Sequence, residues 1–180
     1  MYAGVYNDNV PLNISTDRGL TWTSLSDGLP NSTCRDIHVF EGDSNIIFLA
    51  LEGDYMWRTL DAGGSWERMD SDQGFTDGNA YTVKMHPTDS NIAWAGTRYD
   101  GAFKTTDGGD NWTQMGEEDF EPYVRFLARH PTQPDILFMG TQDGHGVYKT
   151  TDAGETWEEA NDGFTNVDIQ CLAIHPDVQN

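Results

Sequence analysis

The residues best suited to carry chemistry are aspartates that recur in short polar segments along the chain. Asp8, Asp54, Asp100 and Asp143 each follow an apolar run at a comparable place. Two such carboxylates at a suitable separation could hydrolyse a glycosidic bond, one as acid and the other as nucleophile or base. Several carboxylates in a ring could instead bind a cation through oxygen ligands. In an acidic chain they could equally be solvated turn residues with neither role.

Two of these aspartates precede a glycine and an aromatic strand start. Asp100 stands before Gly101-Ala102-Phe103, and Asp143 stands before Gly144-His145-Gly146. They form the candidate catalytic pair. The candidate binding residues are Asp8, Asp54, Tyr99, Asp100, Tyr123, Asp143 and His145. We predict no metal and no cofactor, with a cation at the carboxylate face as the alternative.

Short apolar segments must position these loops, and they recur with a fixed period. One set of predicted strands directly precedes the loops, at 1–7, 47–51, 93–97 and 137–141. A second set alternates apolar and polar residues at Arg35–Phe40, Tyr81–Met85, Val124–Arg129 and Ile169–Ile174. Three members of this second set end in His-Pro, which favours the end of a strand and the start of a turn. We therefore assign these histidines to turns rather than to metal binding.

An eight-residue motif occurs four times and sets the period. It has the form [ST]-x-D-x-G-x-[STN]-W, and its aspartates are 44, 46 and 45 residues apart. A repeat of ~40–45 residues is typical of a four-stranded propeller blade. The Asp carboxylate can accept hydrogen bonds from backbone N–H groups downstream, the Gly supplies a positive φ, and the Trp can wedge between blades. We assign structural roles to Asp17, Gly19, Trp22, Asp61, Gly63, Trp66, Asp107, Gly109, Trp112, Asp152, Gly154 and Trp157.

The motif resembles the Asp-box, or bacterial neuraminidase repeat. This box is found in sialidases, xyloglucan-degrading glycosidases, sortilin-type receptors and a photosystem II assembly factor. The resemblance covers the whole chain and implies an all-β propeller of four Asp-box blades, but these families share the box and not the activity. It also implies that the box lies between the third and fourth strands of each blade, away from the functional face.

The same resemblance offers two enzymatic expectations. In the xyloglucan-degrading enzymes the catalytic aspartates lie in loops like those of Asp100 and Asp143, so a glycoside hydrolase is the alternative function. Sialidases need three arginines that hold the substrate carboxylate, together with a Tyr–Glu pair. Arg18 lies inside a box, on the other face, and no Arg-Ile-Pro motif precedes the first box. We therefore do not expect an active sialidase.

We expect one domain, residues 1–180, made of four blades. Blade 1 comprises 1–27 together with 167–180, blade 2 comprises 33–71, blade 3 comprises 79–116, and blade 4 comprises 122–160. Sharing one blade between the N- and C-terminal segments would close the ring and remove exposed sheet edges. A piece of a longer propeller and a ring made by two chains are the alternatives, so we expect a monomer or a homodimer.

Charge limits the possible partners. The net charge is −20, from 30 acidic and 10 basic residues, which argues against nucleic acid and anionic membrane surfaces. No apolar run is long enough to cross a membrane and no signal peptide is visible, so we expect a soluble protein, secreted or cytoplasmic. The acidity also fits adaptation to high salt. We expect a non-catalytic scaffold that binds a protein or carbohydrate ligand on the loops opposite the boxes.

The two cysteines are too few for a disulfide framework. Cys34 and Cys171 both fall in or near the second set of predicted strands. We expect them to be buried free thiols.

Overall fold

The computed structural model describes residues 1–6, 11–116, 123–142 and 144–175. Within them, 15 strands form four antiparallel sheets in chain order. The first sheet contains β1 (Tyr2–Gly4), β2 (Leu12–Ile14) and β3 (Thr23–Ser24). The second contains β4 (Thr33–Val39), β5 (Ile47–Glu52), β6 (Met56–Thr59) and β7 (Glu67–Met69). The third contains β8 (Ala80–Met85), β9 (Ala93–Thr97), β10 (Ala102–Thr105) and β11 (Thr113–Met115). The fourth contains β12 (Val124–Arg129), β13 (Leu137–Thr141), β14 (Val147–Thr150) and β15 (Glu158–Glu159).

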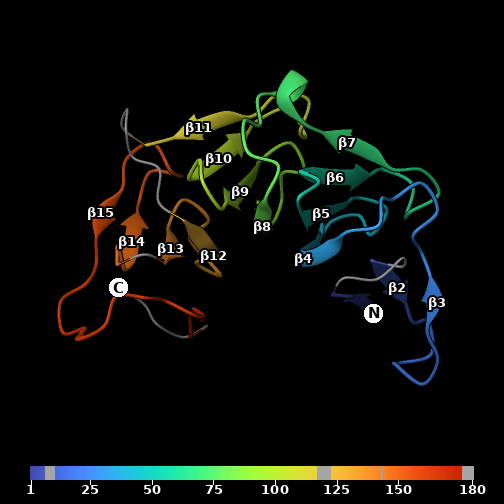
Figure 1. The fold of residues 1–180 in the computed structure, drawn as a ribbon, viewed down its shortest axis with the longest axis horizontal. Coiled ribbons are helices and arrows are strands. Elements are labelled where there is room, and N and C mark those ends of the chain that lie inside the picture. Colours follow the sequence, from blue (N-terminus) through green and yellow to red (C-terminus); the bar gives the residue numbers. More distant parts are fainter. Residues whose placement is uncertain (7–10, 117–122, 143, 176–180) are drawn as a thin grey trace.

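The sheets follow one another around an open arc, as the blades of a propeller do (Figure 1). Strands β4, β8 and β12 line the inside of the arc, and β7, β11 and β15 lie on its outside. In the described part of the chain the one helical segment is a short 3-10 turn at Ser71–Gln73, and no helix is long and apolar enough to cross a membrane. The all-β propeller predicted from the repeat is thus confirmed.

The hydrophobic core lies between adjacent sheets. One cluster joins Phe48 and Met69 of the second sheet to Val83 and Phe103 of the third. Another joins the third sheet to the fourth around Trp94, which is fully buried. The second strand of the second and third sheets is apolar on both faces because it is covered by a neighbouring sheet on each side.

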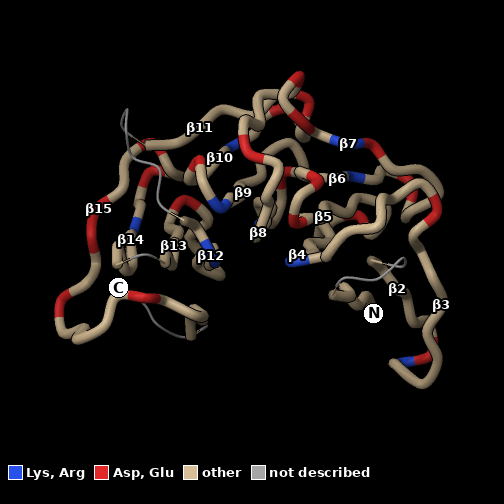
Figure 2. The backbone as a smooth tube through the Cα atoms, in the orientation of Figure 1, with Lys and Arg blue, Asp and Glu red and all other residues tan. Residues whose placement is uncertain are grey.

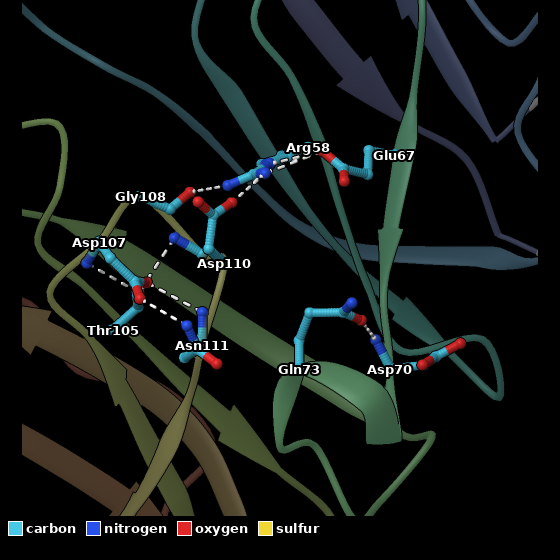
Figure 3. Close-up of polar contacts among 10 residues, drawn as sticks. Arg58, Glu67, Asp70, Gln73, Thr105, Asp107, Gly108, Asp110 and Asn111 are labelled. Carbon is cyan, nitrogen blue, oxygen red and sulfur yellow. Dashed lines mark hydrogen bonds and ion pairs between the residues drawn. The ribbon is translucent and has the colours of Figure 1, made fainter.

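Each box builds a hydrogen-bonded turn, as the sequence predicted. In the third box, the Asp107 carboxylate accepts hydrogen bonds from the Asn111 backbone N–H at 2.9 Å and the Asn111 side chain at 2.8 Å (Figure 3). The Thr105 hydroxyl donates to Asp107 at 2.8 Å and accepts from the Gly109 N–H at 2.9 Å. The other three boxes repeat these bonds. The fixed aspartate, hydroxyl and amide side chains of the boxes are therefore all used in turn hydrogen bonds.

The box turns lie at one end of the blades, together with the turns that follow the inner strands. Backbone N–H groups of Ala62 and Gly108 donate to the carbonyls of Asn45 and Asn91, each at 2.9 Å. Next to these turns, the His86 Nδ1 accepts from the Asp89 N–H at 3.2 Å, which gives this histidine the predicted turn role. The loops that carry Asp54 and Asp100 lie at the opposite end.

The predicted strand at Ile169–Ile174 is wrong for this structure. Residues 167–175 contain no strand, and the first sheet has three strands among the described residues. The Ile169 N–H donates to the Thr141 carbonyl at 2.9 Å, so the segment lies against β13 instead of pairing with β1. Because no strand covers it, Cys171 is exposed rather than buried, whereas Cys34 is half-buried and both are free. The shared blade and its boundaries stay a prediction.

Candidate ligand-binding face

Each inner strand carries one extra residue near its start. In β4 the register passes from Cys34 to Asp36 opposite consecutive residues of β5, which leaves Arg35 as a bulge. The same shift occurs at Tyr81 in β8 and at Arg125 in β12. Bulges re-aim side chains and are frequent near functional sites. These three residues come at the end opposite the box turns.

The first two bulged residues meet at one carboxylate. The Tyr81 hydroxyl donates to Glu52 Oε1 at 2.8 Å, and the Arg35 Nε donates to Glu52 Oε2 at 2.8 Å. The Arg35 guanidinium also lies 4.8 Å from the centre of the Tyr81 ring. Burial opposes ionisation of Glu52, but the hydrogen bonds from Tyr81 and Arg35 outweigh it and lower its pKa.

A second group of side chains extends this arrangement toward the fourth sheet. The rings of Tyr81 and Tyr123 meet edge to face at 5.2 Å. The Arg98 guanidinium lies 5.6 Å from the centre of the Tyr123 ring and 5.1 Å from that of Tyr99. The Arg125 Nη1 donates to the Gln142 side chain at 3.1 Å. We call Arg35, Tyr81, Arg98, Tyr123 and Arg125 the arginine–tyrosine row.

The row concentrates cations in a strongly acidic protein. The chain has 10 basic residues against 30 acidic ones, and three of its arginines stand in this row. Figure 2 shows how widely the acidic residues are spread over the rest of the backbone. Burial and hydrogen bonds with Tyr123 and Glu52 raise the pKa of Tyr81, so its phenol stays protonated. Guanidinium groups bind carboxylates through paired hydrogen bonds, and tyrosines offer flat amphipathic surfaces.

Two of the predicted site residues fall beside each other in this region. Tyr123 belongs to the row, and Tyr99 is exposed next to Arg98, with its backbone N–H bonded to Asp77 Oδ2 at 2.7 Å. His145 is exposed in the loop before β14, and its carbonyl accepts from the Asn161 side chain at 3.2 Å. The structure therefore gathers the aromatic candidates and leaves the histidine apart.

The aspartate candidates are not gathered in the same way. The Asp54 carboxylate lies 3.5 Å from Arg68 Nε on the outer strand β7. Asp100 is half-buried, and its backbone N–H bonds to the Thr97 hydroxyl at 3.2 Å. Asp8 and Asp143 lie outside the described residues. Residues 1–6, 11–116, 123–142 and 144–175 contain no group of three or more acidic, histidine or cysteine side chains placed to hold a metal.

Sequence reasoning missed Arg35, Tyr81 and Arg125. A signal was present, because the three residues occupy the second or third position of equivalent inner strands and are large and polar or aromatic. A search for regular apolar–polar alternation does not detect this signal, because a bulge interrupts the two-residue period of the strand at that position. Aligning the repeats column by column would have brought these residues together.

Comparisons with known proteins agree with this fold. The Sortilin-Vps10 family model, described as sortilin, neurotensin receptor 3, matches residues 11–122. No curated protein matches. Among solved structures, YCF48 bound to a D1 peptide superposes with a TM-score of 0.68 at 21% identity, covering 90% of this chain and 51% of that one. A GH74 xyloglucanase from Xanthomonas campestris superposes with a TM-score of 0.72 at 18% identity, covering 92% and 29%.

These likenesses differ in what they establish. The solved structures are less than a quarter identical to this chain, so they show the propeller fold. The chain spans about half the length of the YCF48 chain and under a third of the xyloglucanase. The family model covers more than half of the residues. The chain therefore belongs to the sortilin and Vps10 family of propellers.

Proposed function

We propose that this chain is a non-catalytic binding scaffold whose ligand site is centred on the arginine–tyrosine row. The ligand is an extended peptide that carries carboxylates, held by the arginines while its backbone and apolar groups lie on the tyrosine rings. The observation that carries the proposal is the repeated bulge, which places Arg35, Tyr81 and Arg125 at the same level of three inner strands. The peptide bound by the structurally similar YCF48 supports a peptide ligand in this fold.

Charge limits where an anionic ligand could bind. The protein carries a net charge of −20, so an anionic peptide is repelled by most of its surface. Binding would therefore need the local cations of the row. Tyr81, whose pKa is raised, is a hydrogen-bond donor and not a phenolate nucleophile. This favours recognition over covalent chemistry at the row.

Binding is tested with a labelled peptide that alternates Ala and Glu, compared with the same peptide containing Gln in place of Glu. Fluorescence anisotropy should detect binding of the Glu peptide by the unmodified chain. The Arg125→Gln variant should bind about tenfold more weakly, because a hydrogen bond to a charged group contributes about 1.5 kcal/mol or more.

The matched control is Arg129→Gln on the same strand. Arg129 lies at the far end of β12, where its Nη2 contacts Glu41 at 3.2 Å, so this variant should bind the peptide as tightly as the unmodified chain. Equal binding by Arg125→Gln and Arg129→Gln would contradict the proposed site.

Hydrolysis is the second candidate function and is tested on the same preparations. Release of reducing sugar from xyloglucan by the unmodified chain, abolished by Asp100→Asn, would overturn the scaffold and establish a hydrolase.

A further inference from the structure

Large exposed apolar side chains gather at the two ends of the arc. Met1, Tyr6, Leu20 and Trp22 are exposed in or beside the first sheet, and Phe164 is exposed after the fourth. Within the described residues, just two others of this kind, Leu60 and Tyr99, lie elsewhere. Exposed apolar patches on soluble proteins mark interaction surfaces.

Two of these exposed residues, Trp22 and Phe164, have counterparts in another repeat that are in contact with each other. Trp112, the tryptophan of the third box, is 4% exposed and packs on the Phe75 ring with 4.8 Å between centroids. Phe75 comes five residues before Ala80, the first residue of β8. Phe164 stands in the same relation to Ile169, and Trp22 is the tryptophan of the first box. Yet Trp22 is 43% exposed and Phe164 is 51% exposed. They are two halves of a contact that this chain leaves unmade.

The segment Ile169–Ile174 already lies where the inner strand of a further blade belongs. Its first N–H donates to the Thr141 carbonyl at 2.9 Å, just as the Cys34 N–H of β4 donates to the Val5 carbonyl at 3.2 Å. A Cβ on Gly140 would stand 2.7 Å from Ile169 Cγ2. The equivalent position in the first sheet, Gly4, would meet Cys34 Sγ at 2.8 Å. The segment thus docks on the fourth sheet as β4 docks on the first.

The inner edge of the first sheet is a strand edge to which such a segment could pair. Among the described residues, β1 pairs with β2 alone. In the third sheet, a Cβ on Gly96 would lie 2.8 Å from Thr82 of its own inner strand, β8. Beside Gly4 there is instead a groove, lined by Gly4 and residues 34–37. An unpaired strand edge is a template for a further strand.

We propose that this edge binds residues 169–174 of a second copy of this chain, so that two copies form one ring through two identical junctions. The register follows from the pairing of β8 with β9, in which Val83 faces Ala95. Transferred to the junction, it places Leu172 of one copy opposite Ala3 of the other. Phe164 and Trp22 then pack together as Phe75 and Trp112 do.

A second copy of this chain fits the curvature of the arc. In Figure 1 the first sheet and the C-terminal segment face each other across a wide opening. Closing the opening within one chain would require a tighter curvature, and therefore different packing in the clusters between neighbouring sheets. A second arc of equal curvature fills the opening while every existing contact is kept. Four sheets from each copy make an eight-bladed ring.

A mixed cross-linking experiment tests the junction and its register. One preparation carries Ala3→Cys and the other carries Leu172→Cys, both with Cys34→Ala and Cys171→Ala. The two are unfolded in urea, mixed, refolded together and oxidised with glutathione disulfide. A covalent two-chain species should form in the mixture and not in either variant alone. Light scattering of the unmodified chain should give about twice 20.1 kDa.

Other results would overturn the proposal. A chain that carries both cysteines and forms a disulfide within itself would show that the ring closes in one copy. A mass of 20.1 kDa for the unmodified chain, or a ladder of species larger than two chains, would exclude the two-copy ring. As a matched pair, Trp22→Ala should shift the two-chain species toward single chains, whereas Leu60→Ala, which is 61% exposed and far from the junction, should not.

Discussion

Replacing Arg58 by Met should weaken the interface between the second and third sheets. Arg58 extends from β6 toward the third box, where its guanidinium donates to the Gly108 carbonyl and the Asp110 carboxylate (Figure 3). It also donates to Glu67 on β7 at 3.0 and 2.8 Å. The arginine is 9% exposed, so one side chain of the second sheet holds a turn of the third from a nearly buried position.

The magnitude follows from the exposure of each partner. The carboxyl side chains of Glu67 and Asp110 are 61% and 62% exposed, so each ion pair contributes about 0–1 kcal/mol. The bond from a charged donor to the Gly108 carbonyl contributes about 1.5–3 kcal/mol. Methionine keeps the apolar part of the side chain in place. The variant should therefore lose about 2–4 kcal/mol of unfolding free energy, or roughly 5–10 °C in Tm for a chain of this size.

Urea unfolding followed by tryptophan fluorescence measures this loss, and Arg68→Met is the control. Arg68 lies on the adjacent strand with a side chain that is 42% exposed, and its ion-pair distances to Asp54 and Asp70 are 3.5 and 3.7 Å. Its loss should be under about 1 kcal/mol. Equal shifts of the urea midpoint for the two variants would refute the argument, because the nearly buried contacts of Arg58 would then stabilise the protein no more than the exposed ion pairs of Arg68.

Three further predictions concern the boxes and the charge. Gly109→Ala should destabilise more than Gly108→Ala, because a Cβ on Gly109 would lie 2.6 Å from Met69 Sδ whereas one on Gly108 has no neighbour closer than 3.7 Å; urea midpoints of both variants check this. Hydrogen bonds from Thr59 and Ser65 hold the pKa of Asp61 at about 2, below its usual 3.8, so its stabilisation is present above about pH 4 and lost as the pH falls through about 2. The stability difference between the unmodified chain and Asp61→Asn should shrink over that range, and a constant difference in acid titrations would contradict this. Because the net charge is −20, Tm should rise between low salt and molar KCl, and a flat or falling curve in scanning calorimetry would exclude adaptation to high salt.

Local chemistry explains what the sequence by itself determined. The repeat and the box turns depend on residues close together in the chain, such as Asp107 and Asn111, whose bond spans four residues. Because these interactions are local, the end of the blades at which the boxes lie and the turn role of His86 could also be predicted. Within the candidate site, Tyr99 and Tyr123 could be predicted because an aromatic residue in a polar loop can be recognised in the sequence without knowing which residues it contacts.

Tertiary structure alone decided how the blades meet. Ile169–Ile174 has the alternation of an inner strand, but a strand needs a partner, and the described structure places it on β13 with no strand beside it. The bulges that align Arg35, Tyr81 and Arg125 depend on pairing with β5, β9 and β13, so a pattern within one strand does not reveal them. The curvature of the arc is likewise set by packing between sheets, since side-chain volumes from two blades together fix the angle between them.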